Sequence, residues 1–382
     1  MLILFAALCA GMAWVTSAIL IYAEKSMPRL SEVALPPDQW QPPLVSVVVA
    51  ARNESRDIEQ AITSMLRLEY QSLQLTVVND RSTDGTGDIL DRLANKFTNL
   101  KVVHLTELPA GWLGKNHALH FGAQRSDGKW LLFTDADIVF EPSSLNRAVW
   151  WAETQALDHL AGVPRVAVKG FLLNSVVAAF AVFFKAHFRP WRARNPNSNS
   201  YIGIGAFNLV KADAYRAIEG HHKLKMRPDD DIKLGKVLKH SGFRQDLIIA
   251  GKMLSVRWYG SITELICGLE KNAFAAVEYN PLTVVCSTLI MLLFFVGPFI
   301  GMCVTTGLPL FLFVIAACLW LACSCQACRG FQQNPWYCVG FPVATLLLIY
   351  IQWRTMLLNY WLGGIRWRET FYPLDELRSN RV

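Results

Sequence analysis

The apolar residues of this chain gather in long uncharged blocks instead of narrow amphipathic stripes. Residues 2–23 carry no charge, and about 20 apolar residues suffice to cross the hydrocarbon core of a bilayer. Lys25 and Arg29 follow this block and no basic residue precedes it, which favours a retained anchor over a cleaved signal peptide. The pattern therefore predicts an N-terminal transmembrane anchor at residues 1–23. Further apolar blocks at residues 283–306, 309–327 and 337–362 predict about three membrane helices within residues 281–362, followed by a tail at residues 363–382.

A polar insert with alternating strand and helix patterns separates the first apolar block from the second. Four prolines between positions 36 and 43 predict a stiff tether over residues 24–43. Residues 44–51, LVSVVVAA, are typical of a strand buried on both faces of a parallel sheet. Helical spacing follows at residues 58–68, and a second buried strand at residues 73–78. Strand, helix and strand at this spacing form a βαβ unit. Residues 44–280 are therefore expected to form a Rossmann-like α/β domain with a mostly parallel sheet.

Polar side chains follow the ends of these predicted strands. Parallel strands end at one edge of a sheet, and open α/β sheets bind ligands in the crevice there. The side chains expected to point toward this crevice are those of Arg52, Asn53, Glu54, Asn79 and Asp80.

A third buried run, WLLFT at residues 130–134, leads into Asp135 and Asp137. Two carboxylates separated by one residue on an extended segment point the same way, as a divalent cation bridging a diphosphate requires. Hard oxygen ligands favour Mg²⁺ or Mn²⁺. An isolated Asp-x-Asp is more often a solvated turn, but its place after a third buried strand favours the metal site.

Four segments occur in a defined order: VSVVVAARNE, NDRSTDGT, GWLGKNHAL and TDAD. Together they resemble the family 2 glycosyltransferases with the GT-A fold. The resemblance implies that Arg52 and Glu54 belong to a uridine-binding loop and that Asp80 holds the base or ribose. It also implies that Asp135 and Asp137 bind the metal and the diphosphate. Lys115 is interpreted as a cation for phosphate oxygens, with an ordinary surface lysine as the alternative.

An inverting transfer needs a general base that takes the proton from the acceptor hydroxyl. Residues 227–235, RPDDDIKLG, resemble the family's (Glu/Asp)-Asp-x-x-Leu segment. The resemblance implies that Asp231 is the base, with Asp230 beside it. Clustered carboxylates repel, which raises the proton affinity of one member, so Asp229 stays a second choice. A charged first turn of a helix after Pro228 is compatible with either choice.

Two segments concern the acceptor side. The glycine-rich run YIGIGAFNL at residues 201–209 resembles the family's acceptor segment. Arg257 and Trp258 resemble part of a (Gln/Arg)-x-x-Arg-Trp segment, which implies contacts with the diphosphate and the acceptor sugar. Leu254 stands at the first position of that segment, which counts against polysaccharide synthesis.

Residues 171–184 are almost wholly apolar and a basic cluster follows them, so residues 171–194 are interpreted as an interfacial segment or a core helix.

The C-terminal residues suggest a lipid acceptor. IRWRETFY at residues 365–372 resembles the Trp-Arg-x-x-x-Tyr ending of ceramide glucosyltransferases and hopanoid-associated glycosyltransferases. A cytosolic insert followed by three complete spans would place the arginines of the tail outside, against the positive-inside preference. The number of spans is therefore left open. The expected location is a bacterial inner membrane in preference to the endoplasmic reticulum or Golgi, with the catalytic domain in the cytosol.

Charge and cysteine usage add little to this interpretation. The net charge of +7 suits an anionic leaflet and anionic nucleotides and requires no nucleic acid. Every cysteine except Cys267 lies in or beside an apolar block, so a disulfide framework is not expected.

The function expected from the sequence is metal-dependent transfer of a sugar from a UDP-sugar to a membrane lipid hydroxyl, with inversion. Three alternatives stay open: a polyprenyl-phosphate sugar synthase, a polysaccharide synthase and a non-catalytic membrane scaffold.

Overall fold

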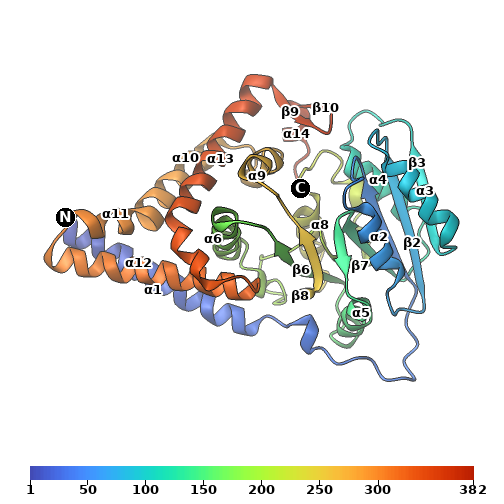
Figure 1. The fold of residues 1–382 in the computed structure, drawn as a ribbon, viewed down its shortest axis with the longest axis horizontal. Helices are drawn as coiled ribbons and strands as arrows, with labels where there is room; N and C mark the ends of the chain where they lie inside the picture. Colours follow the sequence, from blue (N-terminus) through green and yellow to red (C-terminus); the bar gives the residue numbers. More distant parts are fainter. The chain divides into compact units, whose positions relative to one another are not determined.

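The computed structural model describes residues 1–382 and divides into two compact units. The sheet unit contains Met27–Ala167, Pro190–Arg257 and Arg368–Val382, and the helical unit contains Met1–Ser26, Val168–Arg189 and Trp258–Trp367. The sheet unit is built around a central β-sheet, and the helical unit consists mainly of apolar helices (Figure 1).

The sheet unit is built on an eight-stranded sheet with the order β3-β2-β1-β4-β7-β6-β8-β5. β3, β2, β1 and β4 run parallel, while β7 is antiparallel to β4 and β6, and β5 is antiparallel to β8. The mostly parallel α/β sheet expected from the sequence is confirmed. The strands are β1 (Val45–Ala51), β2 (Leu73–Asp80), β3 (Leu100–Leu105), β4 (Trp130–Asp135), β5 (Ile138–Phe140), β6 (His159–Ala167), β7 (Asn208–Lys211) and β8 (Gln245–Arg257).

Helices cover both faces of this sheet, and β1 shows why its sequence is a continuous apolar run. Val47 and Val49 join the cluster that includes Ile58 and Met65, whereas Val48 points the other way into the cluster that includes Leu119. Because successive side chains of a strand alternate between faces, a strand that fills both cores must be apolar at nearly every position, and Ser46 is the one polar residue of β1. The helices are α2 (Ile58–Leu66), α3 (Thr86–Lys96), α4 (Gly114–Ala123), α5 (Ser144–Thr154), α7 (Ala212–Ala217), α8 (Asp230–His240) and α14 (Leu374–Ser379).

The helical unit contains the apolar blocks. Its elements are α1 (Leu2–Ser26), α6 (Phe171–Phe188), α9 (Ile262–Leu269), α10 (Pro281–Ile290), a π-helical turn (Met291–Val296), α11 (Gly297–Val304), α12 (Gly307–Gly330), α13 (Phe341–Leu362) and β9 (Gly364–Trp367). Five helical segments are long and apolar enough to cross a bilayer: Leu2–Ser26, Phe171–Arg192, Pro281–Val304, Gly307–Gly330 and Pro335–Leu362. The chain is a multi-pass membrane protein.

Small side chains allow the helices of this unit to pack closely. α1 buries Ala6, Ala10 and Ala13 and lies along α12 (Figure 1). Backbones approach one another at such residues, which is how helices associate where no hydrophobic driving force acts between them. The hydroxyl of Ser17 donates a hydrogen bond to the carbonyl oxygen of Leu319 in the same interface.

Two segments of uncertain placement in the sequence take definite positions. α6 runs on to Phe188, four residues beyond the apolar run that predicted it, and packs on α12 and α13. Its Ser175 hydroxyl donates to the carbonyl of Tyr337 at 2.8 Å. The predicted tail is divided: β9 belongs to the helical unit, whereas Arg368–Val382, with β10 (Thr370–Pro373) and α14, belongs to the sheet unit.

Candidate active site

The Asp-x-Asp pair lies at the carboxyl end of β4. β4 ends at Asp135, and Asp137 lies in the turn before β5. The sequence analysis predicted that both carboxylates lie on an extended segment. In the structure a turn brings them together instead. Burial, together with the charges of Asp135, Glu54 and Asp57, raises the pKa of Asp137 to about 7. A divalent cation would relieve this repulsion, so the donor set fits Mg²⁺ or Mn²⁺ completed by oxygens of a ligand.

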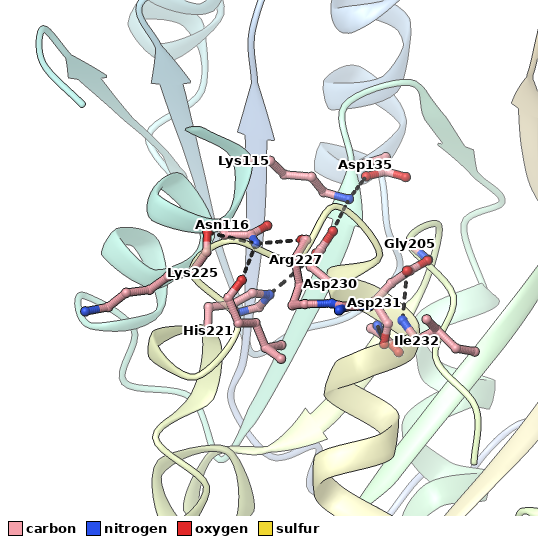
Figure 2. A network of polar contacts seen from close by, with 12 residues as sticks. Lys115, Asn116, Asp135, Gly205, His221, Lys225, Arg227, Asp230, Asp231 and Ile232 are labelled. Atoms are coloured by element: carbon pink, nitrogen blue, oxygen red, sulfur yellow. Dashed lines mark hydrogen bonds and ion pairs between the residues drawn. The ribbon is translucent and has the colours of Figure 1, made fainter. Parts of the chain in front are cut away.

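Lys115 connects this pair to the acidic cluster. It lies in the first turn of α4, and its Nζ is 2.9 Å from Asp135 Oδ1 and 3.3 Å from Asp230 Oδ1 (Figure 2). Burial opposes its charge, but Asp135 and Asp230 outweigh burial and raise the pKa of Lys115. Lys115 is thus a partly buried cation, 22% exposed, that pairs with two carboxylates at a helix N-terminus.

Arg52 and Asp80 meet at the ends of β1 and β2. Asp80 is 2% exposed, and its Oδ2 lies 3.6 Å from Arg52 Nη1. Arg81 donates to both oxygens of Asp80 at 2.7 and 3.1 Å. Buried Nε and Nη1 atoms of Arg52 make no hydrogen bond. Nη1 nevertheless lies within ion-pair distance of Asp80, so the Arg52 guanidinium is held beside this carboxylate at the ends of β1 and β2.

Asn79 does not belong to this crevice. Its amide nitrogen lies 2.9 Å from Nδ1 of His104, whose Nε2 lies 2.8 Å from Asp91 Oδ1. β2 extends through Asn79 and Asp80, and adjacent residues of a strand face opposite sides of the sheet. The expectation that both side chains point into the crevice was therefore wrong for Asn79.

The three consecutive aspartates have different partners. Asp229 accepts two hydrogen bonds of 2.8 Å from Arg227, which is 1% exposed. Asp230 lies near Lys115 and 3.7 Å from His221 Nε2. Burial opposes its charge, but Lys115 and His221 lower the pKa of Asp230. Asp229 is therefore paired with Arg227, and Asp230 with Lys115.

Asp231 differs from its two neighbours. Its Oδ2 accepts the backbone N–H of Gly205 at 2.7 Å, and its Oδ1 accepts the N–H of Ile232 at 2.8 Å (Figure 2). Burial, followed by the charge of Asp230, raises the pKa of Asp231 to about 7. A carboxylate with this proton affinity can accept a proton near neutral pH, which favours Asp231 over Asp229 and Asp230 as a base.

Gly205 lies between the Asp-x-Asp pair and this base. A Cβ atom at position 205 would lie 2.7 Å from Asp135 Oδ2 and 3.3 Å from Asp231 Oδ2. The glycine therefore allows the two carboxylates to flank the same stretch of backbone.

The partners of Asp229 predict a stability effect that separates it from Asp231. Replacing Asp229 with alanine would leave the buried guanidinium of Arg227 without its bidentate partner, and breaking a buried pair costs about 3–5 kcal/mol. We expect a marked fall in the thermal unfolding temperature of Asp229→Ala in detergent. Asp213, whose side chain is fully exposed, provides the control, and Asp213→Ala should unfold like the parent protein. Equal unfolding temperatures for both variants would contradict the structural role of Asp229.

The sequence did not reveal two residues that support the acidic cluster. Asn116 is fully buried and donates to the carbonyls of Leu224 and Arg227 at 2.5 and 2.9 Å. His221 Nδ1 lies 2.8 Å from the hydroxyl of Tyr215. Asn116 follows Lys115 directly, but its contacts are more than 100 positions away, so spacing alone gives no signal for them.

Arg257 and Trp258 fall in different units. Arg257 ends β8, and its Nη1 is 3.5 Å from Asp57 Oδ1. Asp57 is one of the charges that raise the pKa of Asp137, so Arg257 lies on the diphosphate side of the predicted site. Trp258 packs against Phe180 and Tyr259 in tilted arrangements, with ring centroids 5.8 and 4.9 Å apart.

The arrangement of β1, β2 and β4 has a counterpart among known protein families. Residues 46–218 match the family described as "Glycosyl transferase family 2". This segment is a family 2 glycosyltransferase domain. The match ends before Asp229–Asp231, so the assignment of Asp231 rests on the geometry and not on the match.

Two curated relatives of this glycosyltransferase domain differ in their products. The chain is 36% identical over 97 residues to the β-monoglucosyldiacylglycerol synthase of Nostoc sp., covering 25% of this chain and 20% of the relative. It is 25% identical over 168 residues to the poly-β-1,6-N-acetyl-D-glucosamine synthase of Staphylococcus epidermidis, covering 43% of this chain and 39% of the relative. Among the curated relatives that it matches, the chain covers between 20% and 41% of their length.

One solved structure shares the architecture. It is a mannosyltransferase from Pyrobaculum calidifontis in complex with GDP-Man and Mn²⁺, with a TM-score of 0.54 and 17% sequence identity. The similarity covers 94% of this chain and 98% of that structure, so the two chains share a fold.

Proposed function

We propose that the protein transfers one sugar from a nucleoside-diphosphate sugar to a hydroxyl of a membrane lipid, with inversion at the anomeric carbon, at the cytosolic face. The observation that carries the proposal is the position of Asp231. Its carboxylate has a pKa of about 7. The backbone of Gly205 lies between this carboxylate and that of Asp135, close to both. A base and a diphosphate-side carboxylate are thus within reach of one reacting centre.

The donor is held by the residues at the ends of β1, β2 and β4. Asp80 and the guanidinium of Arg52 beside it would bind the nucleobase and ribose. Asp135 and Asp137 would hold Mg²⁺ or Mn²⁺, which when bound neutralises the charge of the departing diphosphate. A uridine nucleotide is our first choice because of the family resemblance of the Arg52–Glu54 loop. The GDP-Man and Mn²⁺ bound by the Pyrobaculum mannosyltransferase support a nucleotide sugar and a divalent cation.

The transfer itself uses Asp231. The acceptor oxygen forms a bond to the anomeric carbon while Asp231 takes the hydroxyl proton. The bond between the anomeric carbon and the diphosphate oxygen breaks, and its electron pair leaves with the nucleoside diphosphate. Lys115 keeps Asp135 and Asp230 paired, so that the proton goes to Asp231, the member of the cluster with the raised pKa.

The lipid acceptor is inferred from the rest of the chain. The glycosyltransferase domain shares its chain with several apolar helices, and the Nostoc relative is named for a glucosyl lipid. The Staphylococcus relative is named for a polysaccharide, which makes repeated addition to a growing chain the second candidate. Polymerisation would use the same donor residues but would give a product of many sugars.

Product analysis separates these candidates. The purified protein in detergent would be incubated with Mn²⁺, a panel of UDP- and GDP-sugars and a total lipid extract, and new products read by mass spectrometry. We expect a lipid that is heavier by one sugar, with UDP-sugars preferred. A ladder of sugar additions would support the polysaccharide synthase instead, and a sugar joined to a polyprenyl phosphate would overturn the hydroxyl acceptor.

A further inference from the structure

The C-terminal segment Arg368–Val382 packs in the sheet unit, against the loop that follows β1. Arg368 donates from Nη1 to the carbonyl oxygen of Asn53 at 2.9 Å, and its Nη2 pairs with the carboxylate of Glu54. Glu369 Oε2 lies 4.0 Å from Arg52 Nη2. One guanidinium and one carboxylate of the C-terminal segment therefore engage the loop that carries Arg52.

The same segment reaches the loop that follows β2. Tyr372 is 5% exposed, and its hydroxyl accepts the backbone N–H of Gly114 at 3.3 Å and makes a side-chain hydrogen bond with Arg81. Arg81 in turn holds both oxygens of Asp80. A side chain at position 114 would collide with Asp80 Oδ2, so Tyr372 contacts the backbone at the point where α4 approaches Asp80 most closely.

Backbone strain gathers at these contacts. Asn53, Arg81, Arg368 and Glu369 have positive φ angles of 54°, 55°, 48° and 68°. Residues other than glycine adopt this left-handed conformation at a cost and keep it only where the surrounding contacts enforce it. Here the contacts are mutual. Arg368 hydrogen-bonds to Asn53, and Tyr372 hydrogen-bonds to Arg81, so the C-terminal segment and the two loops hold each other in place.

The far end of the segment is also anchored. Asn380 accepts the N–H of Met226 and donates to the carbonyl of Lys223, both at 3.0 Å. Lys236 of α8 donates to the carbonyl of Val382, so the C-terminus lies beside α8 (Figure 1). The segment therefore contacts both the loops that follow β1 and β2 and the residues that precede Asp229–Asp231.

We propose that residues Arg368–Tyr372 are part of the donor site, in which Arg368 and Tyr372 are positioning residues that hold Arg52 and Asp80 in the geometry that binds a nucleoside diphosphate. The inference rests on the proposed donor function of Arg52 and Asp80. It adds that donor binding depends on residues that follow α13, with Arg368 lying 315 positions from Asn53.

The test measures donor and acceptor kinetics separately in full-length variants. Arg368→Ala removes a charge-assisted pair and should raise the donor KM, and the Kd for UDP with Mn²⁺, by about 10- to 100-fold. Tyr372→Phe removes one hydroxyl and should raise both by about 2- to 10-fold. The acceptor KM and the kcat at saturating donor should change little. Arg368→Lys should recover part of the affinity, because a lysine keeps the charge without the planar fork.

Controls separate positioning from general stability and from failure of the proposed function. Arg216→Ala removes an arginine whose side chain is 60% exposed on α7 and should leave UDP binding unchanged. Normal UDP affinity in Arg368→Ala and Tyr372→Phe would overturn the inference. A lowered kcat together with similar increases in the donor KM and the acceptor KM, and a lowered unfolding temperature, would also overturn it. Absence of UDP binding by the parent protein would instead overturn the proposed function itself.

Discussion

Asp231→Asn should lower sugar transfer by about 10²- to 10⁴-fold, the usual contribution of a general base, while UDP affinity stays close to that of the parent protein. Asparagine preserves the size of the side chain and can keep the acceptor oxygen for the N–H of Gly205, but it cannot take a proton. The measurement is the initial rate of sugar transfer at saturating donor, combined with calorimetry of UDP in the presence of Mn²⁺. The loss should therefore appear in kcat and not in donor binding.

The pH dependence of the parent protein provides a second measure of the same residue. A base must be unprotonated to act, and burial with the neighbouring Asp230 raises the pKa of Asp231 to about 7. Transfer should therefore rise with pH up to about 7 and level off above it, whereas an ordinary aspartate would stay active down to about pH 4. Near-normal transfer by Asp231→Asn would point to a phosphate acceptor, which needs no strong base, and would contradict a hydroxyl acceptor.

Asp135→Asn and Asp137→Asn should each remove the metal-dependent part of UDP binding. Substitutions next to a metal ligand commonly cost 10- to 100-fold in affinity, so the loss of a ligand should exceed about 100-fold. Calorimetric titration of UDP with and without Mn²⁺ measures the difference. We expect parent protein with Mn²⁺ to bind tightly and both variants to bind as the parent does in the presence of a chelator.

The matched control for these variants is Asp127→Asn, an exposed aspartate of the same unit. It should bind UDP and Mn²⁺ normally. If both variants bound UDP as tightly as the parent protein, and if a chelator changed no affinity, the metal site would be contradicted. Lys115, which pairs with Asp135, would then be the cation that neutralises the diphosphate.

Sequence patterns predicted which residues follow the ends of the parallel strands, because those strands have strong apolar signals. Unbroken apolar runs marked β1, β2 and β4, and Arg52, Asp80 and Asp135 lie at their ends. Local geometry was harder to predict. The turn that holds Asp137 and the alternation that turns Asn79 toward His104 both depend on where a strand ends, to within one residue.

Long-range partners could not be predicted at all. The family resemblance pointed to Asp231 as the base, but the contact of Asp230 with Lys115, which lies 115 positions earlier, could not be predicted from the sequence. The pairing of Arg368 with Glu54 joins residues 314 positions apart. Such contacts are decided by the packing of the whole unit, and a motif of five or ten residues carries no record of them.

The division of the chain between the two units limits how it can thread a bilayer. Both neighbours of α6, β6 and the turn Pro190–Arg192, belong to the sheet unit. We expect this folded unit to lie entirely on one side of the membrane, and the following consequences rest on that expectation. α6 therefore enters and leaves on that side, despite its length of 18 residues. Arg368–Val382 also belongs to the sheet unit, so the chain crosses an even number of times between Arg257 and Arg368. Three apolar helical segments lie there, and this parity requires that at least one of them turns back before it reaches the opposite face.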